Sequence, residues 1–367
     1  MVATAAPDFS SGAISLALDK SPYTVQNGLD ATTSDLSVRG AGDHFFLIRR
    51  YGTDTISRYA ANTPTAAVYT YSTQDAGDQA DSNPYDIVVL NDTKAYLIRY
   101  GSSNLWIVNP SATSEANFKI GSIDLSAYGV GGGAPQMSAG LIKNGKLYVA
   151  MQCLDNTNFS LPATQNGYVA VIDTSTDKEI ATGDANATLK GIALPVRDPV
   201  RLASVPGSDA VLVDADGGYD GDFNQQYDGG IVSIDPDHAY ATTLLVDDGD
   251  SETHPYGTIV DFAVAAGDRA YFVGSTGFGG TQSVYRFNPT SSATPVAVNG
   301  LQGLQLGPVS TDAGGNLWVG QQQPQPSDPA AGLMVFGFQN GAETVLDPLI
   351  GTSLNPLNID FVSAPNS

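Results

Sequence analysis

Short runs of β-branched and aromatic residues recur along the chain, separated by clusters of Gly, Asn, Asp and Pro. Almost no stretch shows the spacing of apolar positions that an amphipathic helix requires. Representative runs are HFFLIRRYG from His44, KAYLIRYG from Lys94, KLYVAMQC from Lys146 and RAYFVGSTG from Arg269. Each run predicts one strand followed by a turn or loop, so the pattern as a whole predicts an all-β protein.

The strand runs are grouped into larger units that repeat along the chain. Residues 83–126 contain four strand-like stretches in a row, and similar segments begin at Ala134 and Tyr256. The first strands of successive units are predicted to begin near Thr33, Pro84, Gln136, Asp198, Gly257, Gly307 and Pro356. This spacing is typical of the four-stranded blades of a β-propeller, and the seven starts predict a seven-bladed β-propeller.

The last repeat unit is incomplete, because LNPLNIDFV supplies one strand before the chain ends. The missing outer strands are found near the N-terminus, where SGAISLALDKSPYTVQ parallels GYVAVIDTSTDKEIATG of an internal blade. We therefore predict that residues 1–367 form one domain whose ring is closed by pairing the N-terminal strands with the C-terminal strand. Such a closure leaves no free sheet edge.

Two segments, KAYLIRYGSSNLWIVNP and GYVAVIDTSTDKEIATG, resemble the YVTN-type β-propeller repeat, in which strand pairs end in a VIDT-like turn. The resemblance covers about two blades as a motif and the whole chain as an architecture. It implies a seven-bladed propeller of the exported, surface type. It implies no single activity, since this superfamily includes binding proteins, lyases and redox enzymes.

Charge and composition narrow the range of partners. Asp and Glu total 38 against 16 Lys and Arg, which gives a net charge of −22 and argues against nucleic acid and anionic membrane surfaces. The hydrophobic content of 42% is enough for a sizeable core, and no apolar run is long enough to predict insertion into a membrane. The strong net charge predicts a monomer, unless the chain is part of a surface assembly.

The location of the protein is predicted from the same composition. The opening MVATAAPDFSSG has neither the basic nor the apolar region of a signal peptide, and Lys and Arg are scarce throughout. Abundant Asn, Gly, Ser and Thr are typical of exported bacterial proteins. We expect an extracytoplasmic protein (periplasmic, secreted or on the cell surface) whose export signal is not in this sequence.

Loop lengths indicate which face of the propeller binds. The four strands of a blade, a to d, run outward from the axis, so the b–c and d–a connections share one face, here called the top face. Long b–c loops are predicted at 154–166 and 214–228, and a long d–a loop at 247–254. The opposite connections, such as LNDTK and IKNGK, are tight turns. Because loops longer than a turn requires usually carry function, the top face is the predicted binding surface.

The most acidic of these loops reads VDADGGYDGDFNQQYDGG. Several carboxylates in one turn-rich segment suit a hard cation that takes six to eight oxygen ligands. The loop departs from the EF-hand pattern, because Gly218 occupies the third acidic position and no Glu closes the loop. The sequence predicts a Ca²⁺ site with Asp214, Asp216, Asp220 and Asp222 as ligands, and a solvated acidic turn is the alternative.

A second constellation is basic and aromatic. IRRYG and LIRYG align at the ends of neighbouring b strands, and an arginine precedes the fourth inner strand. Arginine binds carboxylate or phosphate through two hydrogen bonds, and tyrosine offers a flat apolar face. The predicted ligand-binding residues are Arg50, Tyr51, Arg99, Tyr100 and Arg197. The alternative is that each arginine pairs with a carboxylate of the chain itself.

Signals for catalysis are weak. The G-x-S-x-G elbow, the CxxCH haem site and the Walker loop are all missing from the sequence. His254 follows Asp250 and Glu252 in a top-face loop and is the one candidate for a general base. We therefore favour an exported, non-enzymatic protein that binds a ligand or protein partner on its top face. Alternatives are a calcium-assisted hydrolase or lyase with its site on the same face, and a surface-layer or filament subunit.

Overall fold

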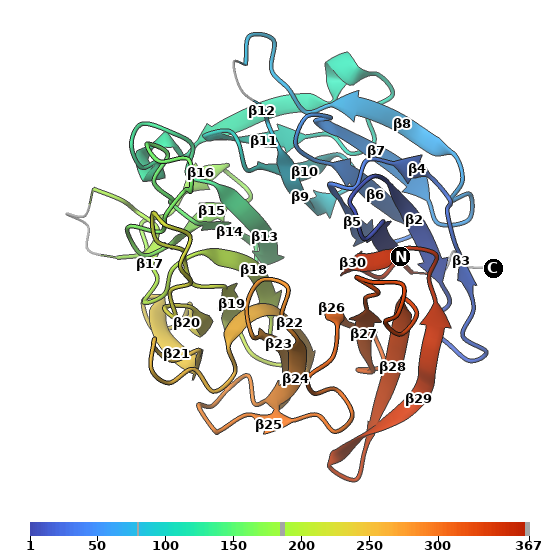
Figure 1. The fold of residues 1–367 in the computed structure, drawn as a ribbon. Helices are drawn as coiled ribbons and strands as arrows, with labels where there is room; N and C mark the ends of the chain where they lie inside the picture. Colours follow the sequence, from blue (N-terminus) through green and yellow to red (C-terminus); the bar gives the residue numbers. More distant parts are fainter. Residues whose placement is uncertain (79–80, 184–187, 364–367) are drawn as a thin grey trace.

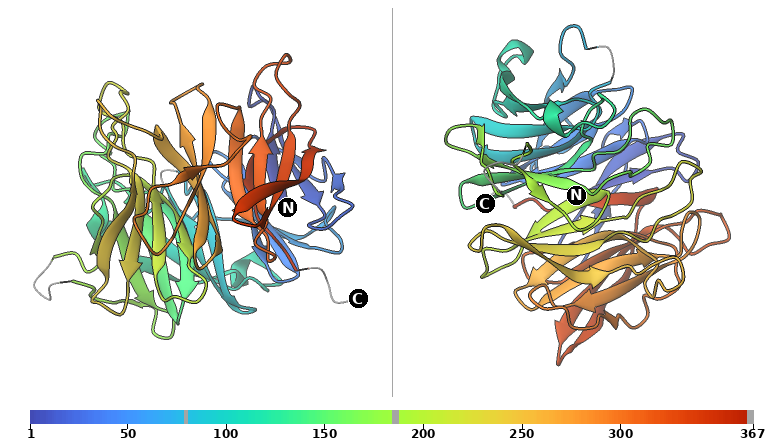
Figure 2. Two further views of the ribbon diagram at one scale, coloured as in Figure 1. Left: turned by 90° about the horizontal axis from the view of Figure 1, so that it is seen from below. Right: turned by 90° about the vertical axis from the view of Figure 1, so that its left-hand side faces the viewer.

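The computed structural model describes residues 1–78, 81–183 and 188–363. Within these ranges the strands form seven antiparallel sheets arranged in a ring around a central axis (Figure 1). Seen from the side, the strands run between the two faces of the ring, and the loops project from both faces (Figure 2). The predicted all-β fold, a seven-bladed β-propeller, is confirmed. In the same described ranges we find no helix long and apolar enough to cross a membrane.

The strands of blades 1 to 4 are given from the axis outward. Blade 1 contains β5 (Leu36–Ala41), β6 (His44–Arg49), β7 (Thr55–Ala60) and β8 (Ala67–Ser72). Blade 2 contains β9 (Pro84–Asn91), β10 (Lys94–Arg99), β11 (Asn104–Val108) and β12 (Lys119–Asp124), with short 3₁₀ helices η1 (Glu115–Asn117) and η2 (Ser126–Tyr128). Blade 3 contains β13 (Met137–Lys143), β14 (Lys146–Met151), β15 (Tyr168–Asp173), β16 (Lys178–Glu179) and β17 (Ile192–Ala193). Blade 4 contains β18 (Pro199–Ser204), β19 (Val211–Ala215), β20 (Gly230–Asp235) and β21 (Ala241–Asp247).

The remaining blades complete the ring. Blade 5 contains β22 (Thr258–Ala266), β23 (Arg269–Ser275), β24 (Gln282–Phe287) and β25 (Val296–Ala297). Blade 6 contains β26 (Leu306–Thr311), β27 (Leu317–Gln321), β28 (Gly332–Gln339) and β29 (Ala342–Gly351). Blade 7 contains β30 (Asn355–Ile359), β1 (Val2–Ala5), β2 (Gly12–Ala17), β3 (Val25–Gln26) and β4 (Ala31–Thr32). All seven inner strands begin within three residues of their predicted starts.

Blade 7 closes the ring as the sequence predicted. The C-terminal strand β30 pairs antiparallel with β1, and β1 pairs with β2. The next junction, between blades 7 and 1, is held by side chains of β30: Asn358 accepts a hydrogen bond from the Val38 amide at 2.9 Å, and Asp360 accepts one from the Gly40 amide at 2.9 Å. The four-residue strand β1 was missed in the sequence, because so short a run of small residues carries little strand signal.

The hydrophobic core lies between neighbouring blades, and strand alternation explains why. In β19, Val211 and Val213 pack into a cluster with blade 3, whereas Leu212 packs into a cluster with blade 5. Successive side chains of a strand point to opposite faces, so each middle strand supplies both of its interfaces. Asp214 follows Leu212 by two positions and therefore lies on the blade 5 side.

Gly40 lies at the closing junction, where the backbones of blades 7 and 1 approach each other closely. A Cβ added to Gly40 would lie 1.9 Å from the carbonyl oxygen of Phe361, so Gly40→Ala forces the backbones apart. We expect a loss of about 1–3 kcal/mol in the free energy of unfolding, measured by urea denaturation. Gly351→Ala is the matched control, because its Cβ would meet nothing within 4 Å. Equal stability of the two variants would contradict this account of the junction.

Candidate functional site

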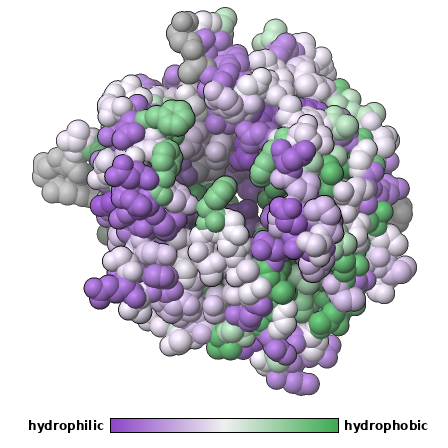
Figure 3. Space-filling model, in the orientation of Figure 1, coloured by the Kyte–Doolittle hydropathy of each residue, from purple (hydrophilic) through white to green (hydrophobic). Residues whose placement is uncertain are grey.

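A central channel runs through the ring and is lined by all seven inner strands. Its cavity has a volume of about 890 Å³, and Figure 3 shows a hollow at the centre of one face. Polar contacts join the middle positions of inner strands in neighbouring blades, which shows that these positions lie at the same height along the axis. These contacts link Arg39 to Asp86, Asp86 to Gly140, and Arg201 to Asp261. The channel wall is therefore polar at mid-height.

A belt of charges surrounds the channel at this level. The Arg39 guanidinium lies 3.5 Å from a carboxylate oxygen of Asp86 and 3.9 Å from one of Asp360. Across the ring, Arg201 lies 2.7 Å from Asp261. Burial raises the pKa of Asp86 and of Asp261, and the neighbouring arginines oppose this rise.

Three belt aspartates also join neighbouring blades. In each, one carboxylate oxygen accepts the amide of the following residue, and the other accepts an amide from the next blade. The interblade bonds are Gly140 N to Asp86 at 3.2 Å, Val309 N to Asp261 at 2.9 Å and Gly40 N to Asp360 at 2.9 Å. The aspartates stand in YDIVV, VDFAV and IDFV, a repeated pattern on the inner strands that sequence reasoning missed. These residues therefore hold the ring together.

An unusual group of carboxylates lies at the top end of blade 4. This blade 4 acidic cluster consists of Asp198 before β18, Asp214 on β19, Asp216 after β19 and Asp248 after β21. Asp214 and Asp248 are fully buried. Within the described ranges, no hydrogen-bond partner reaches either carboxylate oxygen of Asp214 or one oxygen of each of the other three. Gln152, itself 7% exposed, adds an amide oxygen that is also without a described partner.

Burial and mutual repulsion control the ionisation of the cluster. Burial raises the pKa of Asp198 and of Asp248 to about 7, with repulsion from Asp228 adding to it. Burial, together with repulsion from Asp261, raises the pKa of Asp214 well above its ordinary value. Burial and repulsion from Asp214 do the same for Asp216. The four carboxyl groups therefore keep their protons to a higher pH than ordinary aspartates do, and a nearby positive charge would favour their ionised form.

The structure divides the predicted calcium ligands into two pairs. Asp214 and Asp216 belong to the buried cluster, whereas Asp220 and Asp222 lie farther along the loop, where Asp220 accepts hydrogen bonds from Asn224 and from the Asp222 amide. Among the residues with described positions, no three His, Cys, Asp or Glu side chains are grouped to hold a metal ion. Sequence reasoning missed Asp198 and Asp248, which come from other segments of blade 4. Calcium binding itself stays a prediction.

Two of the predicted arginines, Arg50 and Arg197, are paired with carboxylates at the top face. Arg50 donates to Asp35 at 2.6 Å, and its guanidinium lies 4.8 Å from the centre of the Tyr85 ring. Arg197 lies 3.1 Å from Asp228 and donates to the carbonyl of Ala163. The structure does not gather the predicted arginines at the channel, since of Arg50, Arg99 and Arg197 only Arg50 lines its cavity.

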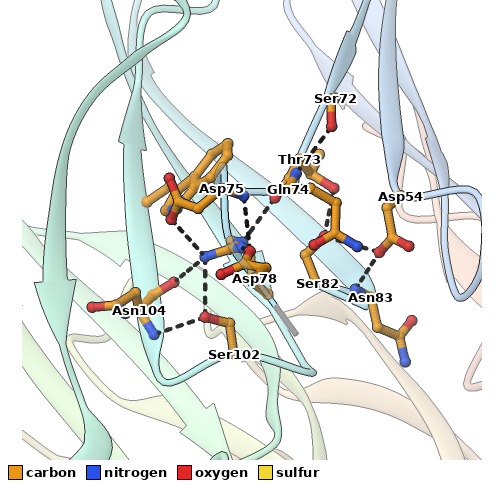
Figure 4. Close-up of polar contacts among 12 residues, drawn as sticks. Asp54, Ser72, Thr73, Gln74, Asp75, Asp78, Ser82, Asn83, Ser102 and Asn104 are labelled. Atoms are coloured by element: carbon orange, nitrogen blue, oxygen red, sulfur yellow. Dashed lines mark hydrogen bonds and ion pairs between the residues drawn. The ribbon is translucent and has the colours of Figure 1, made fainter. Parts of the chain in front are cut away.

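Arg99 is fully buried and bonds to groups of the loop that follows β8, of which Thr73 and Asp78 are labelled in Figure 4. Its guanidinium donates to Asp78 at 2.6 Å, to the Thr73 carbonyl at 3.0 Å and to Ser102 at 3.0 Å. It also lies 4.3 Å from the centre of the Trp106 ring. Its guanidinium nitrogens are engaged by these groups of the chain itself, which is the alternative that the sequence left open for the predicted arginines.

The predicted tyrosines have different surroundings. Tyr51 is 69% exposed on the loop between β6 and β7. Tyr100 stacks on Tyr85 with ring centres 4.4 Å apart, and Tyr85 in turn contacts Arg50. The structure therefore brings Arg50 and Tyr100 together through Tyr85, which sequence reasoning missed and which lines the channel.

The candidate base, His254, lies in an exposed d–a loop. Its ring stacks on Tyr227 with centres 4.0 Å apart, and its Nδ1 lies 3.0 Å from the Asp250 carbonyl, an arrangement that favours a proton on Nδ1. It belongs to neither the channel lining nor the blade 4 acidic cluster. Burial raises the pKa of the Cys153 thiol to about 12, which keeps the thiol protonated.

Comparisons with known proteins show the fold and no family. No protein-family description matches the chain, and no curated protein matches its sequence. The repeat type suggested by the resemblance therefore stays a prediction.

The solved structures with similar folds belong to proteins whose names indicate different functions. Hydrazine synthase from Kuenenia stuttgartiensis superposes with a TM-score of 0.55 at 12% identity, over 80% of this chain and 73% of that one. Apo AztD from Citrobacter koseri gives a TM-score of 0.52 at 12% identity, over 97% and 95% of the two chains. A chain of the mitotic checkpoint complex gives 0.50 at 10% identity, over 87% and 86%. At such identities the likeness shows the propeller fold alone.

Proposed function

We propose that this chain is a binding protein that takes a cationic ligand at its top face, at the blade 4 acidic cluster. The observation that carries the proposal is Asp214, a fully buried carboxylate without a described partner for either oxygen. Attraction from Arg201 and the amide of Ala215 offset only part of the cost of burying this carboxylate, because its pKa stays well above the ordinary value. A ligand that brings positive charge would offset more of it.

The composition of the site supports a cation rather than an anion. The unpaired groups at the top end of blade 4 are acceptors: the oxygens of four carboxylates and of Gln152. The arginines of this region pair with other carboxylates, Arg197 with Asp228 and Arg201 with Asp261, and the attraction of Arg201 for Asp214 and Asp216 offsets only part of their burial. A ligand that donates hydrogen bonds or coordinates oxygen therefore fits, whereas an anion meets only repulsion.

Binding is better supported than catalysis. The enzymatic alternative needs His254 or a top-face carboxylate as a base, and of these the ring of His254 packs on Tyr227 while its Nδ1 faces a backbone carbonyl. The cluster itself contains carboxylates and one amide, which suit the holding of a cation.

The proposal is tested by thermal unfolding with a panel of cations: CaCl₂, MgCl₂ and spermidine, each at matched ionic strength. We expect at least one of them to raise the midpoint of the wild type, and Asp214→Asn to weaken the apparent affinity roughly tenfold or more, about 1.4 kcal/mol. Asp220→Asn and Asp222→Asn are the matched controls, since both residues lie in the same loop outside the cluster. No response of the wild type to the panel, or an equal response of Asp214→Asn, would reject the proposal.

A further inference from the structure

Two arginines of the charged belt line the central channel from opposite sides. Arg39 lies on β5 and Arg201 on β18, and these strands stand across the axis from each other (Figure 1). Their side chains are 35% and 34% exposed. Since both belong to the lining of a cavity of about 890 Å³, a ligand in the channel can reach both guanidinium groups.

The chain itself uses little of the hydrogen-bonding capacity of these two guanidinium groups. Nε of Arg39 lies 3.5 Å from Asp86 and 3.9 Å from Asp360, and both distances exceed that of an ordinary N–H···O hydrogen bond. Nη1 of Arg201 lies 2.7 Å from Asp261. Within residues 1–78, 81–183 and 188–363, no hydrogen bond joins the chain to either Nη group of Arg39, or to Nε and Nη2 of Arg201. Most of the N–H donors of both arginines are therefore free.

The acceptors of the belt are in use, in contrast to its donors. Asp86, Asp261 and Asp360 each accept a backbone amide on both carboxylate oxygens. Asn358, which also lines the channel, accepts the Val38 amide on its Oδ1, and its Nδ2 group has no partner in the described part of the chain. The belt therefore offers a ligand chiefly N–H donors, and these favour a ligand rich in acceptor oxygens.

We infer that the central channel binds a small organic anion with two or more carboxylate groups, at a site separate from the proposed cation site. One carboxylate accepts hydrogen bonds from Arg39 and from Nδ2 of Asn358, and another accepts them from Arg201. Two groups are needed because the two arginines lie on opposite sides of the channel. A guanidinium donates two parallel hydrogen bonds to a carboxylate, which fixes the orientation of the ligand across the axis.

The aspartates beside the two arginines favour a carboxylate over a phosphate. Asp86 lies 3.5 Å from Arg39 and Asp261 lies 2.7 Å from Arg201, so each guanidinium is already partly neutralised. A carboxylate adds one negative charge at each position, whereas a phosphate monoester adds up to two at neutral pH. Repulsion from the aspartates grows with that charge, and so the belt tolerates carboxylates better.

Isothermal titration calorimetry of the whole chain, with succinate, citrate and inorganic phosphate in separate runs at neutral pH, low salt and no added divalent cation, tests the inference. We expect one succinate or citrate per chain, bound at least tenfold more tightly than phosphate. Arg39→Lys and Arg201→Lys should each lose roughly tenfold in affinity, because they keep the positive charge of the belt but lose the paired donors of the guanidinium. Arg197→Lys is the matched control, because Arg197 is 35% exposed and paired with Asp228 but lies outside the channel lining. Urea denaturation confirms that each variant is folded before affinities are compared.

Three other outcomes would overturn the inference. Binding of neither succinate nor citrate to the wild type would show that the free donors of the channel hold no carboxylate ligand. Unchanged affinity in Arg39→Lys and Arg201→Lys would place the bound anion outside the channel. Phosphate bound as tightly as the carboxylates would show a general anion site instead. Because these runs contain no added cation, their failure would leave the proposed function standing.

Discussion

Arg99→Met is expected to destabilise the protein by about 3–5 kcal/mol, the largest effect of any single substitution predicted here. The Arg99 side chain is fully buried, and its loss leaves Asp78 without the guanidinium 2.6 Å away. The Thr73 carbonyl and Ser102 lose their donor at the same time. The side chain of Asp78 is 28% exposed, so water compensates part of its charge. Most of the loss comes from the Thr73 carbonyl, which belongs to a fully buried residue, and from the packing of the Arg99 side chain against Trp106.

Arg50→Met is the matched control for Arg99→Met. Arg50 directly follows β6, the b strand of the neighbouring blade, one position beyond the strand end that Arg99 occupies in β10. Its side chain is 26% exposed and that of its partner Asp35 is 42% exposed. Exposed ion pairs contribute about 0–1 kcal/mol, so the control should unfold at nearly the wild-type urea concentration. An equal decrease in the free energy of unfolding in the two variants would show that burial does not determine how much each arginine contributes to stability.

The second large effect is a loss of stability as the pH rises. The pKa of Asp198 and of Asp248 is about 7 in the folded protein against an ordinary value of 3.8, because burial disfavours the charged form. Between these two pKa values the folded state keeps protons that the unfolded state releases, so stability falls as the pH rises from about 4 to about 7 and is level above that. Between pH 5.5 and 8 each carboxyl accounts for about 2 kcal/mol, or roughly 4 kcal/mol for both.

Urea denaturation of the cation-free protein at these two pH values measures the effect. We expect greater stability at pH 5.5, and a smaller pH dependence in the double variant Asp198→Asn, Asp248→Asn, whose remaining slope comes from Asp214 and Asp216. The pair Asp220→Asn, Asp222→Asn should keep the wild-type slope, because hydrogen bonds to Asn224 lower the pKa of Asp220 rather than raise it. A wild-type protein that is more stable at pH 8 would refute the assignment. A bound cation should reduce the slope, since it favours the ionised cluster.

The architecture was predictable because it depends on local patterns. Strand runs such as KAYLIRYG and KLYVAMQC, their turn residues and their regular spacing are all visible in the sequence. These patterns located the inner strands, including β30, and predicted how the ring closes. Strand propensity and hydrophobic alternation act over a few residues, and so they can be read without the fold.

The candidate site was predictable only in part. The sequence drew attention to Asp214 and Asp216 because they stand close together in one acidic loop. It also aligned Arg50 with Arg99, yet one of these arginines is exposed to solvent and the other is buried under a loop. The alignment was one residue out of step, because β6 ends at Arg49 and β10 ends at Arg99, so Arg49 is the structural counterpart of Arg99.

The sequence by itself therefore determined the strands, their order and the face that carries the long loops. Only the tertiary structure decided that Asp198, Asp214, Asp216 and Asp248 lie within electrostatic range of their neighbours at the top of blade 4. The reason is physical: strand formation depends on neighbours along the chain, whereas burial, charge repulsion and cavity shape depend on residues that only the closed ring brings together.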